Sequence, residues 1–160
     1  MIDEEVTAVV LAIIVVFGVF SVSQVFLAGG VVEPFSELAI LGPNQKIGDY
    51  PKNLTAGEEF DLYLYIGNHE GRVMHYRVYV KLGDQSSTIN ETVPLDVSPI
   101  EEYEQILLHN QTWLEPITLH IDEPGMNYRL VFEMWVYDID GMFAYHGRWN
   151  QLWLNAILTN

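Results

Sequence analysis

A long stretch without charged residues near the N-terminus limits the folds open to this chain more than any other feature. The stretch runs from Val6 to Ala28 and spans 23 residues. As an α-helix rising about 1.5 Å per residue it would be about 35 Å long, which matches the ~30 Å hydrocarbon core of a bilayer with some tilt. Gly29 and Gly30 would end the helix, because glycine readily takes the left-handed cap conformation. We therefore predict an apolar N-terminal helix over residues 1–30, either a filament core or a membrane span.

Two interpretations of this helix follow from general sequence rules. A cleaved secretory signal is disfavoured, because the apolar run is too long and Asp3, Glu4 and Glu5 precede it where a signal carries basic residues. A single-span anchor fits the length. However, no Lys or Arg occurs before Lys46, so the positive charge that orients an anchor is missing from both flanks. Removal of a basic leader ahead of Met1 would explain that absence.

A third interpretation comes from Met1 and Glu5, followed by a helix rich in Val, Ile, Ala and Phe. This start resembles the mature N-terminus of a type IV pilin or archaellin. The resemblance implies that a basic leader is removed, that the helices bundle into a filament core, and that the acidic side chain pairs with a neighbouring amino terminus. The residues that we assign to assembly are Glu5, Val9, Ala12, Val16 and Phe20. Asp3 and Glu4 depart from the common pattern, and they also suit the positive end of a helix dipole.

Residues 31–160 have a different pattern, in which apolar and polar residues alternate. Phe60, Leu62 and Leu64 are separated by Asp61 and Tyr63, and a period of two is typical of half-buried strands with one face on a core. The expected strands are roughly 35–41, 58–67, 72–82, 87–93, 102–108, 114–121, 127–138 and 142–157, with the last interrupted near Gly147. About eight short strands with regular turns and no convincing internal helix predict a mainly β fold, a β-sandwich.

A second resemblance covers most of residues 35–155. It is carried by Phe35-Ser-Glu-Leu with Gly42-Pro43, Tyr50-Pro51, Leu54-Thr-Ala-Gly57-Glu58, Asn68-His69-Glu70-Gly71, His109-Asn-Gln-Thr-Trp113, Pro124-Gly125 and Leu152-Trp153-Leu154. These motifs are similar to those of an uncharacterised archaeal membrane-protein family, a domain of unknown function. The resemblance implies an extracytoplasmic, immunoglobulin-like β-sandwich over residues 31–160 and no known reaction. Typical members carry several membrane helices ahead of this domain, whereas this chain has one candidate.

The charge balance argues against two classes of partner. The chain has 22 Asp and Glu against 7 Lys and Arg, a formal net charge of −15. Nucleic-acid binding needs basic side chains that neutralise phosphates, and a polybasic anchor on anionic lipid needs a cluster of them. The chain also has no cysteine, which excludes a disulfide framework, a thiol nucleophile and thiolate metal sites.

No catalytic motif is present in the sequence, so we predict neither an enzyme nor a cofactor. His69, His75, His109, His120 and His146 do not have the spacing of a metal site on a helix. Asp138-Ile-Asp140-Gly141 is similar to the first part of a calcium loop. It lacks the remaining oxygen ligands and the distal Glu, so a β-turn is the default interpretation and no metal ligand is assigned.

Three asparagines stand in the acceptor pattern for N-linked glycosylation. They are Asn53, Asn90 and Asn110, each followed two residues later by Thr. All three fall in or near expected turns, where a glycosylating enzyme could reach them. If the domain lies outside the cell, we expect at least one to carry a glycan; otherwise they are ordinary turn asparagines.

Aromatic residues gather in the last third of the chain. Alternation predicts that Phe132 and Met134 point inward, so Trp135 and Tyr137 point outward unless a bulge breaks the pattern. An exposed aromatic patch is typical of a surface that packs against a neighbouring protein. The predicted interaction surface comprises Trp135, Tyr137, Trp149 and Trp153.

Together these features favour a structural subunit of an extracellular type IV pilin-like filament. Its apolar helices would form the core, and its sandwiches would form an outer sheath that N-linked glycans modify. The partners would be other copies of the chain, and the membrane before assembly. The alternative is a single-pass, membrane-anchored extracytoplasmic subunit of a cell-envelope complex that acts as a protein-binding module. Both hypotheses place the β-domain outside the cell.

Overall fold

The computed structural model describes residues 15–16 and 33–158, and the chain divides into two compact units, Met1–Glu33 and Pro34–Asn160. Val15 and Val16 are α-helical. The rest of the predicted apolar helix, with Glu5, Val9, Ala12 and Phe20, lies outside the described residues. Within the described ranges, no helix is long and apolar enough to cross a membrane.

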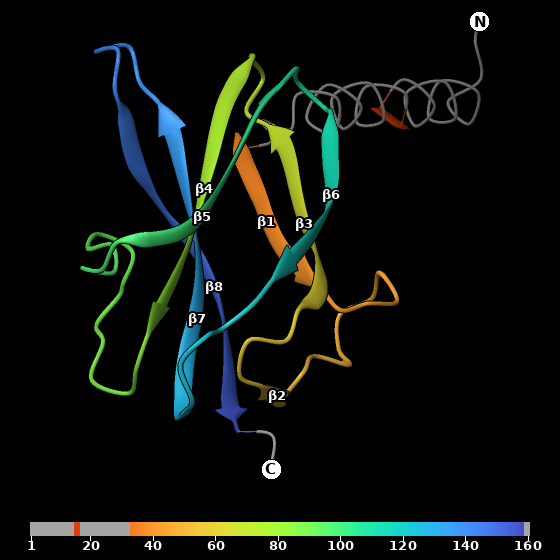
Figure 1. Cartoon of the computed structure of the whole chain (residues 1–160). Helices are drawn as coiled ribbons and strands as arrows, with labels where there is room; N and C mark the ends of the chain where they lie inside the picture. The colour runs from red at the N-terminus through yellow and green to blue at the C-terminus, as the bar shows by residue number, and fades with distance from the viewer. Residues whose placement is uncertain (1–14, 17–32, 159–160) are drawn as a thin grey trace, which may run out of the picture. The chain divides into compact units, whose positions relative to one another are not determined.

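The second unit is a sandwich of two β-sheets (Figure 1). The smaller sheet has the order β1-β3-β6, formed by Phe35–Leu41, Phe60–His69 and Thr112–Leu119. The larger has the order β2-β8-β7-β4-β5, formed by Asn53–Thr55, Phe143–Ile157, Gly125–Tyr137, Met74–Gly83 and Pro99–Leu107. Neighbouring strands are antiparallel except for β2 and β8. The predicted mainly β sandwich is confirmed.

Most expected strands occur, and two differences have physical causes. The strand expected over 87–93 is wrong, because these residues belong to the β4–β5 connection, 84–98. There the Asn90 side chain accepts hydrogen bonds from the backbone N–H groups of Thr92 and Val93, which closes a local turn in place of strand pairing. The second difference is the short strand β2, which was not among the expected strands. Its three residues pair only with the end of β8.

The main core lies between the two sheets and follows the alternation seen in the sequence. Leu62, Leu64 and Ile66 of β3 are fully buried, while the residues between them remain partly accessible or exposed. Phe132 and Met134 of β7 are also fully buried, as predicted. Burial of this apolar surface, which stabilises a fold by about 25 cal/mol per Å², therefore holds the two sheets together.

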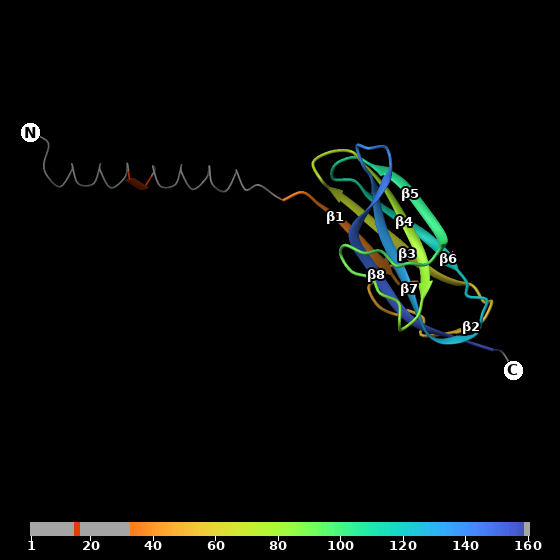
Figure 2. The same ribbon diagram turned by 90° about the vertical axis from the view of Figure 1, so that its left-hand side faces the viewer.

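A second, smaller core lies on the outer face of the five-stranded sheet. The β4–β5 connection crosses in front of β7 and β8 (Figure 2), and its residues Ile89 and Leu95 pack with Val131 and Trp149. Val131 is fully buried although it points away from the main core. The connection therefore acts as a cover over part of this sheet face.

A bulge in β8 makes room for this cover. The β7–β8 pairing shifts register between Glu133 and Trp135, and Gly147 of β8 has a φ of 81°, a conformation that glycine adopts without steric cost. A Cβ atom at Gly147 would lie 2.5 Å from the carbonyl oxygen of Glu91. The β4–β5 connection can therefore approach β8 this closely because the residue is glycine. The strand interruption expected near Gly147 is a bulge within one continuous strand.

Candidate interaction surface

Seven aromatic side chains from β4, β7 and β8 share the outer face of the five-stranded sheet. We call this surface the aromatic face; it comprises Tyr79, Trp135, Tyr137, Phe143, Tyr145, Trp149 and Trp153. The strand register brings them together, because Trp135 lies opposite Tyr145 and Tyr137 lies opposite Phe143. Cross-strand pairs on one face are the contacts that stabilise a sheet locally.

At one end of the aromatic face, rings and charges form a connected group. The rings of Tyr137 and Phe143 meet edge to face, with centroids 5.3 Å apart, and the His75 ring contacts both. The Arg77 guanidinium lies 3.9 Å from the Phe143 ring centroid, within the range of a cation–π contact. Its Nε also donates a hydrogen bond of 2.9 Å to the Glu104 carboxylate of β5.

These contacts shift the protonation equilibria of the charged groups. Hydrogen bonds from Arg77 and then from His75 hold the pKa of Glu104 below its usual range. The bonds to Tyr79 and Glu104 raise the pKa of Arg77. Both groups therefore keep their charge at neutral pH, and the guanidinium stays fixed over the aromatic rings.

A buried ion pair lies beneath the centre of the aromatic face. Lys81 Nζ is 2.9 Å from Glu133 Oε2, with 8% and 0% of the side chains exposed. Lys81 Nζ also donates to the carbonyl of Leu95 at 2.7 Å, and the Leu95 N–H donates to Glu133. Trp135 Nε1 donates to the same carboxylate at 3.2 Å. The pair is thus satisfied by groups that hold the β4–β5 connection onto the sheet.

Tyr145 connects the aromatic face to the β4–β5 connection. Its hydroxyl donates a hydrogen bond of 3.0 Å to the carbonyl of Asn90. Burial, followed by the negative charge of Glu133, raises the pKa of Tyr145 to about 12. The phenol therefore remains a protonated donor at physiological pH, and this contact persists.

The other end of the aromatic face is built around Arg129. Its guanidinium lies 5.4 Å from the Trp149 ring centroid and 5.6 Å from that of Trp153. Arg129 also donates to Gln151 and to the carbonyl of Ser87. Because its hydrogen bonds hold the guanidinium beside both indole rings, this end presents a cation–π group of defined geometry.

The four residues predicted as an interaction surface all lie on the aromatic face, with different exposure. Tyr137 and Trp153 are 49% and 44% exposed, whereas Trp135 and Trp149 are partly covered. Phe143 and Tyr145 also belong to this face, although the predicted interaction surface did not include them. The sequence also did not predict the ion pair beneath the face, because alternation predicts Lys81 and Glu133 to be solvated.

The three candidate glycosylation sites are exposed. Asn53 lies in β2, Asn90 in the β4–β5 connection and Asn110 in the β5–β6 turn. The side-chain Oδ1 of Asn90 accepts a hydrogen bond of 2.9 Å from the Thr92 hydroxyl. Exposure makes each site accessible to modification, and occupancy stays a prediction.

The segment similar to a calcium loop forms the turn between β7 and β8. The Gly141 N–H donates to the carbonyl of Asp138 at 3.0 Å, and the Asp138 N–H donates to the carbonyl of Met142 at 2.9 Å. These are hairpin contacts, so the β-turn interpretation is confirmed. Among the residues that the structure describes, no three His, Asp or Glu side chains converge as metal ligands.

A polar cluster is enclosed near the start of β1. The buried Ser36 hydroxyl donates a bond of 2.6 Å to Glu70 and lies 2.9 Å from the Tyr76 hydroxyl. His146 Nε2 is 3.9 Å from Glu70, and its Nδ1 is buried without a hydrogen-bond partner. Burial lowers the pKa of His146, and the Glu70 charge opposes this shift. Ser36 contacts the carboxylate and the phenol, which is a structural arrangement and not the hydroxyl–imidazole pair that activates a nucleophile.

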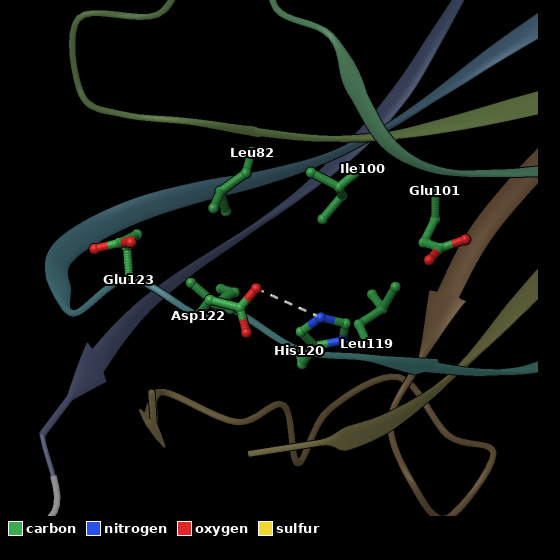
Figure 3. Close-up of a pocket in the computed structure, with 8 residues that line it drawn as sticks. Leu82, Ile100, Glu101, Leu119, His120, Asp122 and Glu123 are labelled. Carbon is green, nitrogen blue, oxygen red and sulfur yellow. Dashed lines mark ion pairs between the residues drawn. The ribbon is translucent and has the colours of Figure 1, made fainter. Parts of the chain in front are cut away.

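A cavity of about 370 Å³ opens between β5 and the end of β6 (Figure 3). Its apolar side is formed by leucine and isoleucine side chains, and its polar side by carboxylates and a histidine. The lining residues are Leu82, Ile100, Glu101, Leu119, His120, Ile121, Asp122 and Glu123. His120 Nε2 is 3.7 Å from Asp122 Oδ2, and both side chains are largely exposed.

Several solved structures are similar to this chain at low sequence identity. The solution structure of a CARDB domain from Pyrococcus furiosus has a TM-score of 0.50 and 10% identity, covering 79% of this chain and 98% of that chain. A crystal structure of the same domain gives a TM-score of 0.48 and 11% identity over 79% and 96% of the two chains. A PapD-like domain of human CEP192 gives 0.41 and 16% identity over 82% and 96%. The CARDB likeness, at its higher TM-score, supports the predicted immunoglobulin-like sandwich.

Comparison with curated proteins gives no significant match. The family comparison, in contrast, matches residues 30–143, which include most of the sandwich. This result confirms the family resemblance that the motifs of residues 35–155 indicated. The chain belongs to the family described as Domain of unknown function (DUF1616).

Proposed function

We propose that this chain is a cell-surface protein-binding module, held at the membrane by its apolar N-terminal segment and contacting a neighbouring protein through the aromatic face. The observation that carries the proposal is the pair of half-exposed aromatic side chains, Tyr137 and Trp153, on a face whose other aromatic rings are partly covered. Aromatic and arginine side chains are the residues that most often dominate binding energy at protein interfaces.

The local charge of the aromatic face supports the same conclusion. Arg77 and Arg129 are two of only seven Lys and Arg in a chain of net charge −15, and both lie partly exposed on this face. Basic groups among aromatic rings, in an otherwise acidic protein, would complement an acidic or aromatic partner surface. Such complementarity selects among partners and speeds encounter.

A binding test can place a photo-crosslinking amino acid at position 153 or 137 of the full chain in its native cells. We expect covalent adducts at both positions and few at position 114, because the exposed Leu114 lies on β6 of the other sheet. Trp153→Ala should reduce the adduct formed from position 137, whereas Leu114→Ala should not. Equal labelling at all three positions, or no adducts from the aromatic face, would contradict the proposal.

A filament subunit, which the sequence features favoured, is the second candidate. It is favoured by the missing Lys and Arg on both flanks of the apolar run, which a removed basic leader would explain. In that case the partner is another copy of the chain, so the crosslinked adduct would have twice the mass of the chain. The family match begins at residue 30 and therefore says nothing of the pilin-like start.

Two measurements separate the anchored module from the filament. Mass spectrometry of the N-terminus should find a processed precursor in the filament case. Electron microscopy of sheared surface material should then show filaments that contain the chain, and Glu5→Ala should impair them. Recovery of the chain solely in the membrane fraction, with Glu5→Ala nearly silent, would establish the anchored module instead.

A further inference from the structure

One end of the sandwich carries three turns as well as the start of β1. We call it the proximal end; it comprises the turns at 70–73, 108–111 and 138–142, together with Phe35. Both views show these turns at the same end of the domain (Figures 1 and 2). The Phe35 ring stacks on His69, with centroids 4.6 Å apart, so the start of β1 is fixed to the adjoining turn.

Hydrogen bonds connect the first two turns into a single platform. The Gly71 N–H donates to His109 Nδ1 at 3.0 Å, and the Asn68 N–H donates to the carbonyl of Gln111 at 2.9 Å. The fully buried Asn68 side chain donates to the carbonyls of Arg72 and Leu107. The turns at 70–73 and 108–111 are thus held in a defined arrangement, which positions the exposed side chains on them.

Each of the three turns presents an exposed aliphatic side chain. Val73 and Leu108 are 57% and 54% exposed, and Ile139 and Met142 are 91% and 70% exposed. Turns normally carry Gly, Pro, Asn, Asp or Ser. Four aliphatic side chains at one end of an acidic domain therefore indicate that this end meets an apolar environment.

The covalent chain indicates which apolar environment this is. Only residues 29–34 separate the end of the apolar run at Ala28 from Phe35, and seven residue steps span at most about 25 Å. If the run spans a bilayer, the proximal end is the part of the sandwich tethered closest to the lipid headgroups. We propose that the proximal end rests on the bilayer surface, with Val73, Leu108, Ile139 and Met142 in the boundary between headgroups and acyl chains.

The charges around these side chains define the kind of lipid surface. Asp138 and Asp140 flank Ile139, which keeps the turn at the interface and out of the hydrocarbon. The net charge of −15 disfavours anionic headgroups, so the surface is a zwitterionic one. This inference rests on the anchored form of the proposed function, but it uses a different surface from the aromatic face.

The absence of cysteine from the chain permits a direct test. Ile139→Cys, Met142→Cys and Leu108→Cys, each in the full chain, can carry an environment-sensitive fluorophore in phosphatidylcholine vesicles that contain brominated lipid. Ile47→Cys is the matched control, because Ile47 is 81% exposed and lies in the β1–β2 connection at the other end of the sandwich (Figure 1).

We expect blue-shifted emission at the three proximal positions and at least about twofold more quenching by brominated lipid there than at position 47. Quenching at the proximal positions no greater than at position 47 would overturn the inference, as would failure of the full chain to float with the vesicles. The crosslinking test at position 153 reports separately on the proposed function. Quenching without crosslinks would retain the membrane contact and remove the protein-binding role.

Discussion

The polar side chains buried within the described sandwich are Ser36, Asn68, Lys81 and Glu133, and each has hydrogen-bond partners. A buried polar group costs free energy unless it is hydrogen-bonded. At the scale of single residues, these four therefore specify which segments meet. Ser36 and Asn68 fix the proximal end, while Lys81 and Glu133 fix the β4–β5 connection.

Replacement of Ser36 by Ala should destabilise the domain. The substitution would remove the donor to Glu70 and the partner of the Tyr76 hydroxyl, and leaving a buried polar group unsatisfied costs about 1–3 kcal/mol. Urea unfolding measures the loss. Ser86→Ala is the control, because Ser86 is exposed in a connection and bonds only to Asp84. Equal stability of the two variants would contradict the assigned role of Ser36.

His146 should make the stability of the domain depend on pH. Burial lowers its pKa despite the neighbouring Glu70, and Arg148 lowers it further. The unfolded chain therefore binds the proton at higher pH than the folded chain does. The resulting stability is present above the unfolded pKa of about 6.5 and is lost as the pH falls through the folded pKa. The unfolding free energy of the wild type should fall more steeply below about pH 6.5 than that of His146→Gln. Parallel pH profiles would show that His146 has no such effect.

At the scale of elements, the β8 bulge and the β4–β5 connection depend on each other. The bulge places Gly147 where the connection passes, and the connection covers Val131 and Trp149. Loss of either feature would expose the small core that they form together. This interdependence explains why Ile89 and Leu95 are buried although the segment 84–98 forms no strand.

Gly147→Ala should therefore lower the free energy of unfolding by more than backbone strain alone would. Gly71→Ala is a matched control, because Gly71 also has a positive φ of 72° but open space where the Cβ would lie. We expect about 1 kcal/mol for Gly71→Ala from backbone strain, and a larger loss for Gly147→Ala because its Cβ would meet Glu91. Urea unfolding followed by tryptophan fluorescence measures the loss of stability in both variants. Similar losses would mean that the connection moves away without cost.

The Lys81–Glu133 pair should behave as a coupled unit. Lys81→Met or Glu133→Leu alone leaves one buried polar partner unsatisfied, and breaking a buried ion pair costs about 3–5 kcal/mol. The double variant Lys81→Met with Glu133→Leu should lose less than the two single losses added together. A thermodynamic cycle from urea unfolding measures this coupling. Strict additivity of the losses would argue that the pair is solvated in solution.

At the scale of the whole molecule, the domain has surfaces of different chemistry. The aromatic face gathers rings and two partly exposed basic groups, and the proximal end gathers aliphatic side chains. The remaining surface carries most of the acidic residues, which favours solubility outside these contacts. The two proposals therefore use different surfaces of the domain, and each can be tested without the other.

Glycan occupancy should reflect this arrangement. Asn110 lies on the proximal end, in the turn at 108–111, whereas Asn53 and Asn90 lie in other parts of the domain. A large hydrophilic glycan at Asn110 would oppose contact with lipid. In the native host we expect a mass decrease on Asn53→Gln or Asn90→Gln and none on Asn110→Gln, measured by intact-protein mass spectrometry. Glycosylation at Asn110 would argue that the proximal end faces water.

Alternating apolar and polar residues predicted most of the strands and the apolar face of the core, although not β2 and not the absence of a strand at 87–93. This pattern is a local property, because successive side chains of a strand point to opposite faces. It correctly predicted the bounds of β1 at 35–41 and the inward direction of Phe132 and Met134. The sequence also indicated that Trp135, Tyr137, Trp149 and Trp153 share a surface, because they are outward-facing positions of the last two strands.

Contacts between distant residues decided the rest. The Leu95–Glu133 bond joins residues 38 positions apart, and no local pattern shows that a connection will fold back and bury an ion pair. The proximal platform likewise depends on the Gly71–His109 contact, which also spans 38 positions. The sequence by itself therefore determined which side of each strand is apolar, since that depends on nearest neighbours. Only the tertiary structure decided which outward side chains are covered, because covering depends on where remote segments pack.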